Sequence, residues 1–374
     1  MSKLEFTINQ SDHQARTGLL QVNGRQIETP ALVASGDELA KLSPIQLNQA
    51  GVSAVKTSGL KRWLKYDSMT EKLGDLHRFF QWDGLLLVDL ETEEAYHLAK
   101  PRGKKHDGVR FHDPATGQLK FWQPETALQV QEALGADIFQ SFDQATDYYA
   151  PVDDLKAGVK QTSDWLSVVK PQKGQSLGSI GGGGLKDLRT ASIKAVDEAG
   201  LSGYRLSGIP NNLEDQEFSR IINEITPKLE EEKLRYLPAA LSFDQMIGAI
   251  LAGVDLIDSN LAAKKAANGI ALVNQGATVL HLDRQHFSFD SQVLDRQHFS
   301  FDSQVLDRQC ACATCRAGYS RALLHSLITN QSFYGEQLLL QHNLFTLNKL
   351  MNSLRQAIKN HQTKKFVQEL LQNQ

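Results

Sequence analysis

The chain has 374 residues, of which 41% are hydrophobic and 22% are charged, and its formal net charge at pH 7 is −3. This composition excludes an intrinsically disordered chain and a coiled-coil rod, and the length suffices for one large domain or two ordinary ones. The sequence has no apolar run of about eighteen residues, and its first residues lack the pattern of a secretory signal. We therefore expect a soluble, cytoplasmic protein without a membrane partner.

Charge is unevenly distributed along the chain. Residues 316–374 contain seven Lys and Arg against two Glu, a net charge of +5, whereas the preceding 315 residues carry 33 basic and 41 acidic side chains, a net charge of −8. A basic end on an acidic body is suited to holding a polyanion at one place. A charged, solvent-facing surface on amphipathic terminal helices explains the same pattern, so both interpretations stay open.

Short apolar, β-rich runs alternate with longer helical stretches along most of the chain. We predict eight strands, at residues 29–34, 52–58, 84–90, 136–142, 176–180, 202–207, 234–239 and 254–259. The clearest helices between them lie at residues 124–134, 153–169 and 185–199. This α/β pattern favours a (β/α)8 TIM barrel. An open doubly wound sheet is the rival, and the strand count and the missing glycine-rich dinucleotide turn disfavour it.

Two segments interrupt this alternation. Residues 91–123 are too long for an ordinary connection, and we interpret them as an elaborated loop or small hairpin on the catalytic side of the barrel. Residues 282–293, with the sequence LDRQHFSFDSQV, recur without change as residues 294–305. Two such short copies cannot stack into a solenoid core, so we expect an enlarged hairpin or loose loop with no chemistry of its own.

All three cysteines of the chain, Cys310, Cys312 and Cys315, lie close together in a Cys-x-Cys-x-x-Cys pattern. One turn of chain with this spacing can wrap a tetrahedral Zn²⁺, with each sulfur about 2.3 Å from the ion. The fourth ligand must come from elsewhere, and His325 and His342 are the nearby candidates. A site with four protein ligands is structural, because no position stays open for substrate. The alternative is a set of free or redox-active thiols.

Aspartates stand at the ends of three predicted strands: Asp89, Asp143 and Asp258. Catalytic groups of a parallel barrel gather at the carboxyl ends of its strands, although any one of these residues alone is equally well explained as a helix N-cap. Four consecutive glycines at residues 181–184 either let the backbone approach a ligand or form a flexible turn. Carboxylates that converge in a barrel mouth suit chemistry at a glycosidic carbon.

Longer motifs extend these observations. Gly-Asp-Leu-His-Arg-Phe-Phe-Gln-Trp stands at residues 74–82, Gly-Val-Asp-Leu-Ile-Asp at 253–258, and the cysteine motif is followed by Tyr-Ser-Arg-Ala at 319–322 and His-Asn-Leu at 342–344. With these motifs the chain resembles the tRNA-guanine transglycosylase (queuine tRNA-ribosyltransferase) family over nearly its full length. The resemblance implies a barrel with an inserted zinc-binding subdomain. It also implies that guanine in tRNA is exchanged for a 7-deazaguanine base such as queuine or preQ1, in queuosine biosynthesis.

The resemblance further implies roles for individual residues. Asp258 matches the nucleophile that attacks ribose C1′ and holds the tRNA covalently, and Asp89 matches the general acid/base for the leaving and arriving bases. Asp143 matches the acceptor that reads the N1–H and 2-amino edge of the base, while Gly181 and Gly208 stand in base-contacting turns and are expected to bind substrate. The four structural zinc ligands match Cys310, Cys312, Cys315 and His342.

Several positions differ from the family's pattern. Leu-Glu-Thr-Glu-Glu at residues 90–94 replaces Ser-Gly-Gly-Phe-Gln, Gly181 stands where the family has a base-reading Gln, and Ala-Ala-Lys-Lys at 262–265 stands near its Pro-Thr-Arg. An active base-exchange enzyme is one interpretation. A catalytically weakened paralogue that serves as a tRNA-binding or accessory subunit is another. A transglycosylase that acts on a different nucleic acid, such as DNA, is a third.

We expect the chain to divide into three parts. These are a barrel with the catalytic mouth at residues 1–271, a zinc-binding subdomain at residues 272–345 that includes the duplication, and a C-terminal helical segment at residues 346–374 that packs on the barrel. Because members of the family resemble one another in dimerising through the zinc-bearing region, we also expect a homodimer, or a heterodimer with a paralogue.

Overall fold

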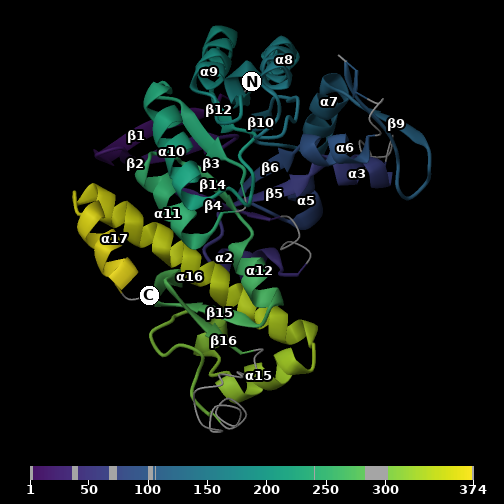
Figure 1. The fold of residues 1–374 in the computed structure, drawn as a ribbon. Helices are drawn as coiled ribbons and strands as arrows, with labels where there is room; N and C mark the ends of the chain where they lie inside the picture. Colours follow the sequence, from purple (N-terminus) through teal and green to yellow (C-terminus); the bar gives the residue numbers. More distant parts are fainter. Residues whose placement is uncertain are drawn as a thin grey trace.

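The computed structural model describes residues 3–35, 41–66, 74–99, 104–105, 107–239, 241–282 and 302–372. Within them the chain forms a parallel β-barrel surrounded by helices, with a smaller lobe beside it and a long helix running between the two (Figure 1). Most of the duplicated segment, residues 283–301, lies outside the described residues. The expectation of a loop there stays a prediction.

Eight parallel strands form the barrel. In chain order they are β4 (Ala31–Ser35), β5 (Ala54–Ser58), β6 (Leu85–Asp89), β10 (Phe139–Gln140), β11 (Ser176–Ile180), β12 (Gly203–Leu206), β13 (Leu234–Leu237) and β14 (Leu256–Ser259). The sheet order runs from β10 through β14 to β4, β5 and β6, and a parallel bridge between Leu87 and Ile138 joins β6 back to β10. The sheet therefore closes, and the predicted (β/α)8 barrel is confirmed.

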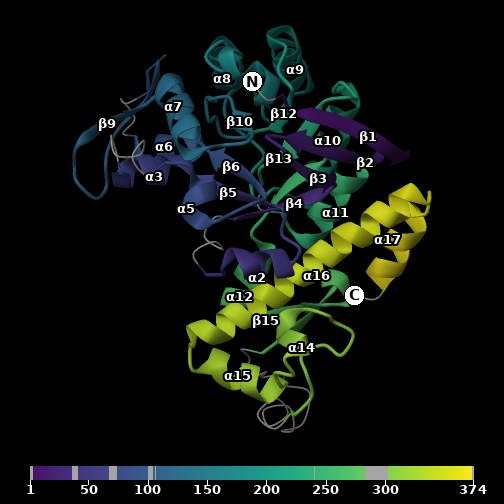
Figure 2. The same ribbon diagram turned by 180° about the vertical axis from the view of Figure 1, so that it is seen from behind.

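Helices cover the outside of the barrel (Figures 1 and 2). They are α2 (Pro44–Gln49), α3 (Gly59–Tyr66), α5 (Leu76–Phe80), α7 (Pro124–Leu134), α8 (Val152–Trp165), α9 (Lys186–Ala199), α10 (Asp215–Ile225), α11 (Phe243–Leu251) and α12 (Leu261–Ala267), with 3-10 turns η2 (Lys170–Gln175) and η3 (Thr226–Lys228). Helix α7 starts at a proline and ends before Gly135 in the left-handed conformation. Both signals are readable in sequence, so its predicted bounds are confirmed.

The insertion at residues 91–123 contains one helix and a small antiparallel sheet. Its elements are α6 (Thr92–Leu98), β7 (Lys104–Lys105), β8 (Gly108–His112) and β9 (Leu119–Trp122). The Trp122 side chain is fully buried and its Nε1–H donates to the Leu90 carbonyl oxygen at 3.0 Å. The hairpin expected from the sequence is present, whereas helix α6, which carries Thr92 to the barrel mouth, was not predicted.

An antiparallel sheet near the N-terminus closes the amino-terminal end of the barrel. It consists of β1 (Glu5–Asp12), β2 (Ala15–Val22) and β3 (Arg25–Thr29), and the strands at residues 5–22 were not predicted from the sequence. Leu20 and Val22 pack in one buried cluster with the inward-facing barrel residues Leu85, Leu177 and Leu234. In the described part of the chain the interior at this end of the barrel is filled with apolar side chains, so we look for a ligand site at the opposite end.

The smaller lobe contains β15 (Ile270–Val273), β16 (Thr278–His281), α14 (Ala313–Arg316), α15 (Arg321–Thr329) and the turn η4 (Asn274–Gly276). Helix α16 (Phe333–Lys359) lies between the lobe and the barrel, and α17 (Thr363–Gln372) follows it (Figure 2). Helix α16 runs through position 345 without interruption and bonds to both parts, for example through Arg355 Nη1 and the Pro30 carbonyl oxygen at 2.6 Å. The three-part division of the chain stays a prediction. Among the described helices, none has the length and apolar character needed to span a bilayer.

Candidate active site and metal centre

The barrel interior changes from apolar to polar along its strands. Because side chains alternate between the two faces of a strand, Lys56 follows Ala54 on the inward face of β5, and Asp258 follows Leu256 on the inward face of β14. On β12, Arg205 follows Gly203 in the same way. The carboxyl-terminal half of the barrel is therefore lined by charged groups, which need partners because they are buried.

The three predicted aspartates meet at this end of the barrel. Lys56 Nζ lies 2.8 Å from Asp89 Oδ2 and also pairs with Asp258. Arg205 joins the third carboxylate to the first, with Nη1 3.3 Å from Asp143 Oδ2 and Nη2 3.8 Å from Asp89 Oδ1. Two cations thus link all three carboxylates into one buried cluster.

The pKa values of Asp89 and Asp258 are shifted in opposite directions. Burial tends to raise the pKa of Asp89, but Lys56 and Arg205 outweigh it and lower that pKa below its usual value. For Asp258 burial is the largest influence, and it raises the pKa despite the favourable charge of Lys56. Burial tends to lower the pKa of Lys56, but Asp89 and Asp258 outweigh it and hold the pKa well above its ordinary value. Asp89 is consequently the more readily ionised carboxylate of the pair.

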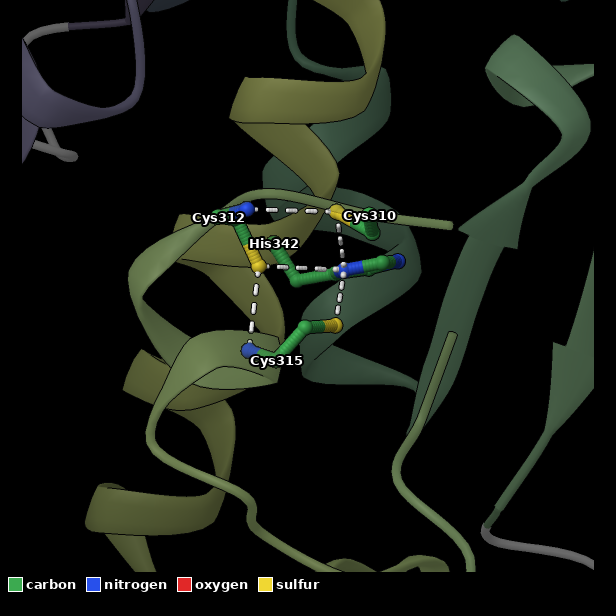
Figure 3. A group of neighbouring side chains, drawn as sticks. All are labelled: Cys310, Cys312, Cys315 and His342. Carbon is green, nitrogen blue, oxygen red and sulfur yellow. Dashed lines mark hydrogen bonds between the residues drawn. The ribbon is translucent and has the colours of Figure 1, made fainter. Parts of the chain in front are cut away.

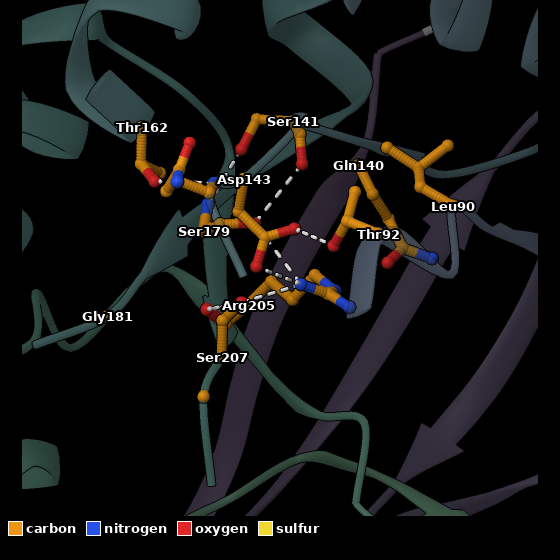
Figure 4. Close-up of polar contacts among 12 residues, drawn as sticks. Leu90, Thr92, Gln140, Ser141, Asp143, Thr162, Ser179, Gly181, Arg205 and Ser207 are labelled. Carbon is orange, nitrogen blue, oxygen red and sulfur yellow. Dashed lines mark hydrogen bonds and ion pairs between the residues drawn. The ribbon is translucent and has the colours of Figure 1, made fainter. Parts of the chain in front are cut away.

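Both oxygens of Asp143 already accept hydrogen bonds (Figure 4). Thr92 Oγ1 donates to Oδ1 at 2.6 Å, and Arg205 Nη1 donates to Oδ2 at 3.3 Å. Arg205 Nη1 also donates to Ser207 Oγ at 2.6 Å and lies 3.4 Å from Ser179 Oγ. The predicted base-reading carboxylate is therefore occupied by side chains of the protein itself.

Gly181 and Gly208 follow β11 and β12 at the same end of the barrel. The buried guanidinium of Arg189 on α9 holds both turns, since Nη1 donates to the carbonyl oxygens of Ile180 at 2.9 Å and Ser207 at 2.7 Å. A β-carbon placed on either glycine would meet no other atom within 4 Å. Both glycines thus border open space, and their contact with a substrate stays a prediction.

Lys56 and Arg205 were not among the site residues predicted from the sequence. Each is a long cationic side chain on the inward face of a short strand whose neighbouring inward position, Ala54 or Gly203, is small. A charge on that face is unfavourable unless a partner of opposite charge lies nearby. Applying strand alternation to the two runs, together with the aspartates at the strand ends, would have revealed both cations.

A cavity of about 200 Å³ lies against Asp89. Its lining includes cationic groups from β5 and α3, and neither Asp143 nor Asp258 contributes to it. The cationic groups are Lys56, Lys61, Arg62 and Lys65. Open space at the mouth therefore has a basic wall on the side of α3, although Lys61 Nζ also lies 3.4 Å from Glu91 Oε1.

The three cysteines surround one nitrogen of His342 (Figure 3). His342 Nδ1 lies 3.6 Å from Cys310 Sγ, 3.4 Å from Cys312 Sγ and 3.5 Å from Cys315 Sγ. A tetrahedral ion about 2.3 Å from sulfur and about 2.0 Å from nitrogen would place those atoms about 3.5 Å apart. The spacing fits such an ion, so the four side chains form a group that can hold a metal.

The surroundings of the cluster orient its ligands. His342 Nε2 lies 2.8 Å from the Leu272 carbonyl oxygen, which fixes the ring with Nδ1 toward the sulfurs. Backbone N–H groups of Cys312 and Cys315 donate to Cys310 Sγ and Cys312 Sγ at 3.4 and 3.3 Å. His325 Nδ1 instead lies 2.6 Å from the Leu282 carbonyl oxygen. Of the two histidines considered from sequence, His342 belongs to the cluster.

Comparison with known proteins agrees with this arrangement. The family model described as queuine tRNA-ribosyltransferase matches residues 11–374. A queuine tRNA-ribosyltransferase of Listeria monocytogenes serotype 4b is 30% identical over an alignment of 382 residues, which covers 100% of this chain and 97% of the relative. One of Listeria welshimeri serovar 6b is 29% identical with the same coverage. The similarity thus extends over both the barrel and the cysteine cluster.

Proposed function

Because the chain belongs to the queuine tRNA-ribosyltransferase family, we propose that it exchanges guanine in tRNA for a 7-deazaguanine base such as queuine or preQ1. The meeting of Asp89, Asp143 and Asp258 at one end of the barrel carries this proposal. The basic wall of the cavity beside Asp89 supports a polyanionic substrate. A tRNA substrate also agrees with the cytoplasmic location expected from the sequence.

In the proposed reaction, Asp258 attacks ribose C1′ and forms a C–O bond while the N-glycosidic bond to guanine breaks. Asp89 gives a proton to the departing base. The incoming base then loses a proton to Asp89, its nitrogen attacks C1′, and the bond to Asp258 breaks. Two inversions at one carbon leave the configuration retained, and one N-glycosidic bond replaces another, so no external energy source is required.

We further propose that the metal held by Cys310, Cys312, Cys315 and His342 is Zn²⁺. Three sulfurs and one imidazole nitrogen at tetrahedral spacing are the donor set that zinc prefers in structural sites. With all four positions filled by protein, the ion would stabilise the lobe and supply no chemistry at the reacting carbon. The residues themselves would tie the cysteine turn to α16.

Trapping a covalent intermediate tests the reaction. Wild-type protein incubated with tRNA should give a protein–tRNA band on a denaturing gel, and labelled 7-deazaguanine base should enter the tRNA. Asp258→Asn should abolish the band and the exchange while the unfolding temperature stays within a few degrees. Asp153→Asn, at a side chain that is 97% exposed on α8, is the matched control and should retain both. If Asp258→Asn retained both the protein–tRNA band and the base exchange, Asp258 could not be the nucleophile.

A second function is favoured by the position of Lys56. Its ammonium group lies between Asp89 and Asp258, where the proposed reaction develops positive charge on the ribose, and a fixed cation there opposes that charge. The lowered pKa of Asp89, which Lys56 and Arg205 produce against the effect of burial, also makes that carboxyl a weak proton donor at neutral pH. These facts support a tRNA-binding accessory subunit, for which binding without adduct or exchange is the expected result.

Either function is compatible with the oligomer expected from sequence. Leu323, Phe333 and Tyr334 are exposed apolar side chains in the region of the cysteine cluster, with exposed fractions of 42%, 54% and 46%. Exposed apolar side chains on α15 and at the start of α16 are compatible with a protein contact in this region. We therefore retain the proposal of a homodimer, or of a heterodimer with a paralogue in the accessory case.

A further inference from the structure

Arg205 lies where the proposed function requires a purine. Its guanidinium group lies against Asp143 (Figure 4). Its Nη2 also lies 3.8 Å from Asp89 Oδ1, and only 8% of the residue is exposed. Nη1 has acceptors in Asp143, Ser207 and Ser179. While the side chain stays in this position, an incoming base has to compete with Arg205 Nη1 for Oδ2 of Asp143.

Guanine and arginine present the same chemical unit to a carboxylate. The N1–H, C2 and 2-amino group of guanine form a planar guanidine fragment whose adjacent N–H groups match two carboxylate oxygens. The guanidinium group of arginine offers the same adjacent donors in one plane. On Asp143, Arg205 uses only one of these donors, Nη1 to Oδ2 at 3.3 Å, so it holds one of the two places that the edge of the base would take.

A second buried arginine shows how a purely structural guanidinium is held. All three nitrogens of Arg189 donate to backbone carbonyl oxygens, with Nε reaching Gly183 and Nη2 reaching Gly208. In contrast, Arg205 Nε is buried and has no hydrogen-bond partner within the described part of the chain. Its contacts with the two carboxylates are also long, at 3.3 and 3.8 Å. Arg205 is thus less completely bonded than Arg189 and is easier to displace.

We propose that Arg205 determines base specificity by occupying the Asp143 subsite until a base with a guanidine-type edge displaces it. This inference rests on the proposed function, in which Asp143 reads that edge. The free protein then binds guanine weakly, because every binding event must first break an internal ion pair. Bases without paired N–H donors cannot replace the lost contact, so they are rejected.

Calorimetric titration of guanine into the full chain tests this proposal. Arg205→Met removes the donors at similar volume and should bind guanine about tenfold more tightly than wild type, the worth of one hydrogen bond to a charged group. Arg205→Lys keeps a charge for Asp89 and Asp143 but loses the planar fork, and it should also bind more tightly than wild type. Lys194→Met, at a side chain that is 77% exposed on α9, is the control and should leave the affinity unchanged.

A competition experiment gives a second measurement on a different variant. In Arg205→Ala, guanidinium chloride at low millimolar concentration should compete with guanine, because the free ion refills the vacated place, whereas it should not alter guanine binding to wild type. Equal guanine affinity in wild type and folded Arg205→Met and Arg205→Lys would overturn the inference while leaving the proposed function intact if tRNA still binds. Absence of both tRNA and base binding in every variant would instead overturn the proposed function and this inference with it.

Discussion

The metal centre and the barrel mouth are both buried clusters of polar groups that need partners, and the partners come from different sources. In the metal centre three sulfurs and one nitrogen point at a common central position, and the partner they need comes from outside the chain. In the mouth, Asp89, Asp143 and Asp258 are paired within the chain with Lys56 and Arg205. The first cluster gains stability when a ligand enters, whereas the second must give up internal contacts before a ligand can enter.

Removing the metal should lower the stability of the protein more than removing a cation from the mouth or changing the pH, and it tests whether the metal centre depends on its ion. Because the proposed zinc joins the cysteine turn to α16, chelation should lower the free energy of unfolding by roughly 5 kcal/mol or more. Differential scanning calorimetry with and without a strong chelator measures this. Cys312→Ser should be destabilised by itself and respond little to chelator, and an unchanged unfolding temperature of metal-free wild type would contradict a structural metal.

Removing a cation from the mouth should have the next largest effect. Lys56→Met leaves Asp89 and Asp258 buried without their shared partner, and breaking a buried ion pair in this way costs about 3–5 kcal/mol. Chemical denaturation at neutral pH measures the loss. The double variant Lys56→Met with Asp258→Asn should recover part of the lost stability, because only one buried carboxylate is then left without the partner that Lys56 provided. A stable Lys56→Met single variant would remove the contrast between the two clusters.

The same contrast explains which features could be read from the sequence. The cysteine spacing predicts a metal site because local chain geometry alone brings three ligands together, and Asp89 and Asp258 follow from their positions at strand ends. Lys56 and Arg205 became meaningful only once the barrel had closed, because their partners come from strands distant in sequence. The N-terminal sheet was missed for a similar reason, since the apolar residues of β1 to β3 find their packing partners in the barrel interior.

Acid pH should produce the smallest effect, and its sign should differ between the two carboxylates that share Lys56. The folded-state pKa of Asp89 is lowered, because Lys56 and Arg205 outweigh burial, so its ionisation stabilises the fold above the unfolded-state pKa of about 3.9. That stability is lost as the pH falls through the lowered folded-state value.

Asp258 should behave in the opposite sense. Burial raises its folded-state pKa, so its contribution to the free energy of unfolding is fully present below the unfolded-state pKa of about 3.9. That contribution is lost as the pH rises through the folded-state pKa. Between pH 3 and 7, the stability difference between wild type and Asp89→Asn should therefore grow with pH, while that between wild type and Asp258→Asn should shrink. Asp153→Asn, at an exposed position, should show a flat difference in the same thermal unfolding series. Parallel curves for Asp89→Asn and Asp258→Asn would contradict the opposite pKa shifts of these two carboxyl groups.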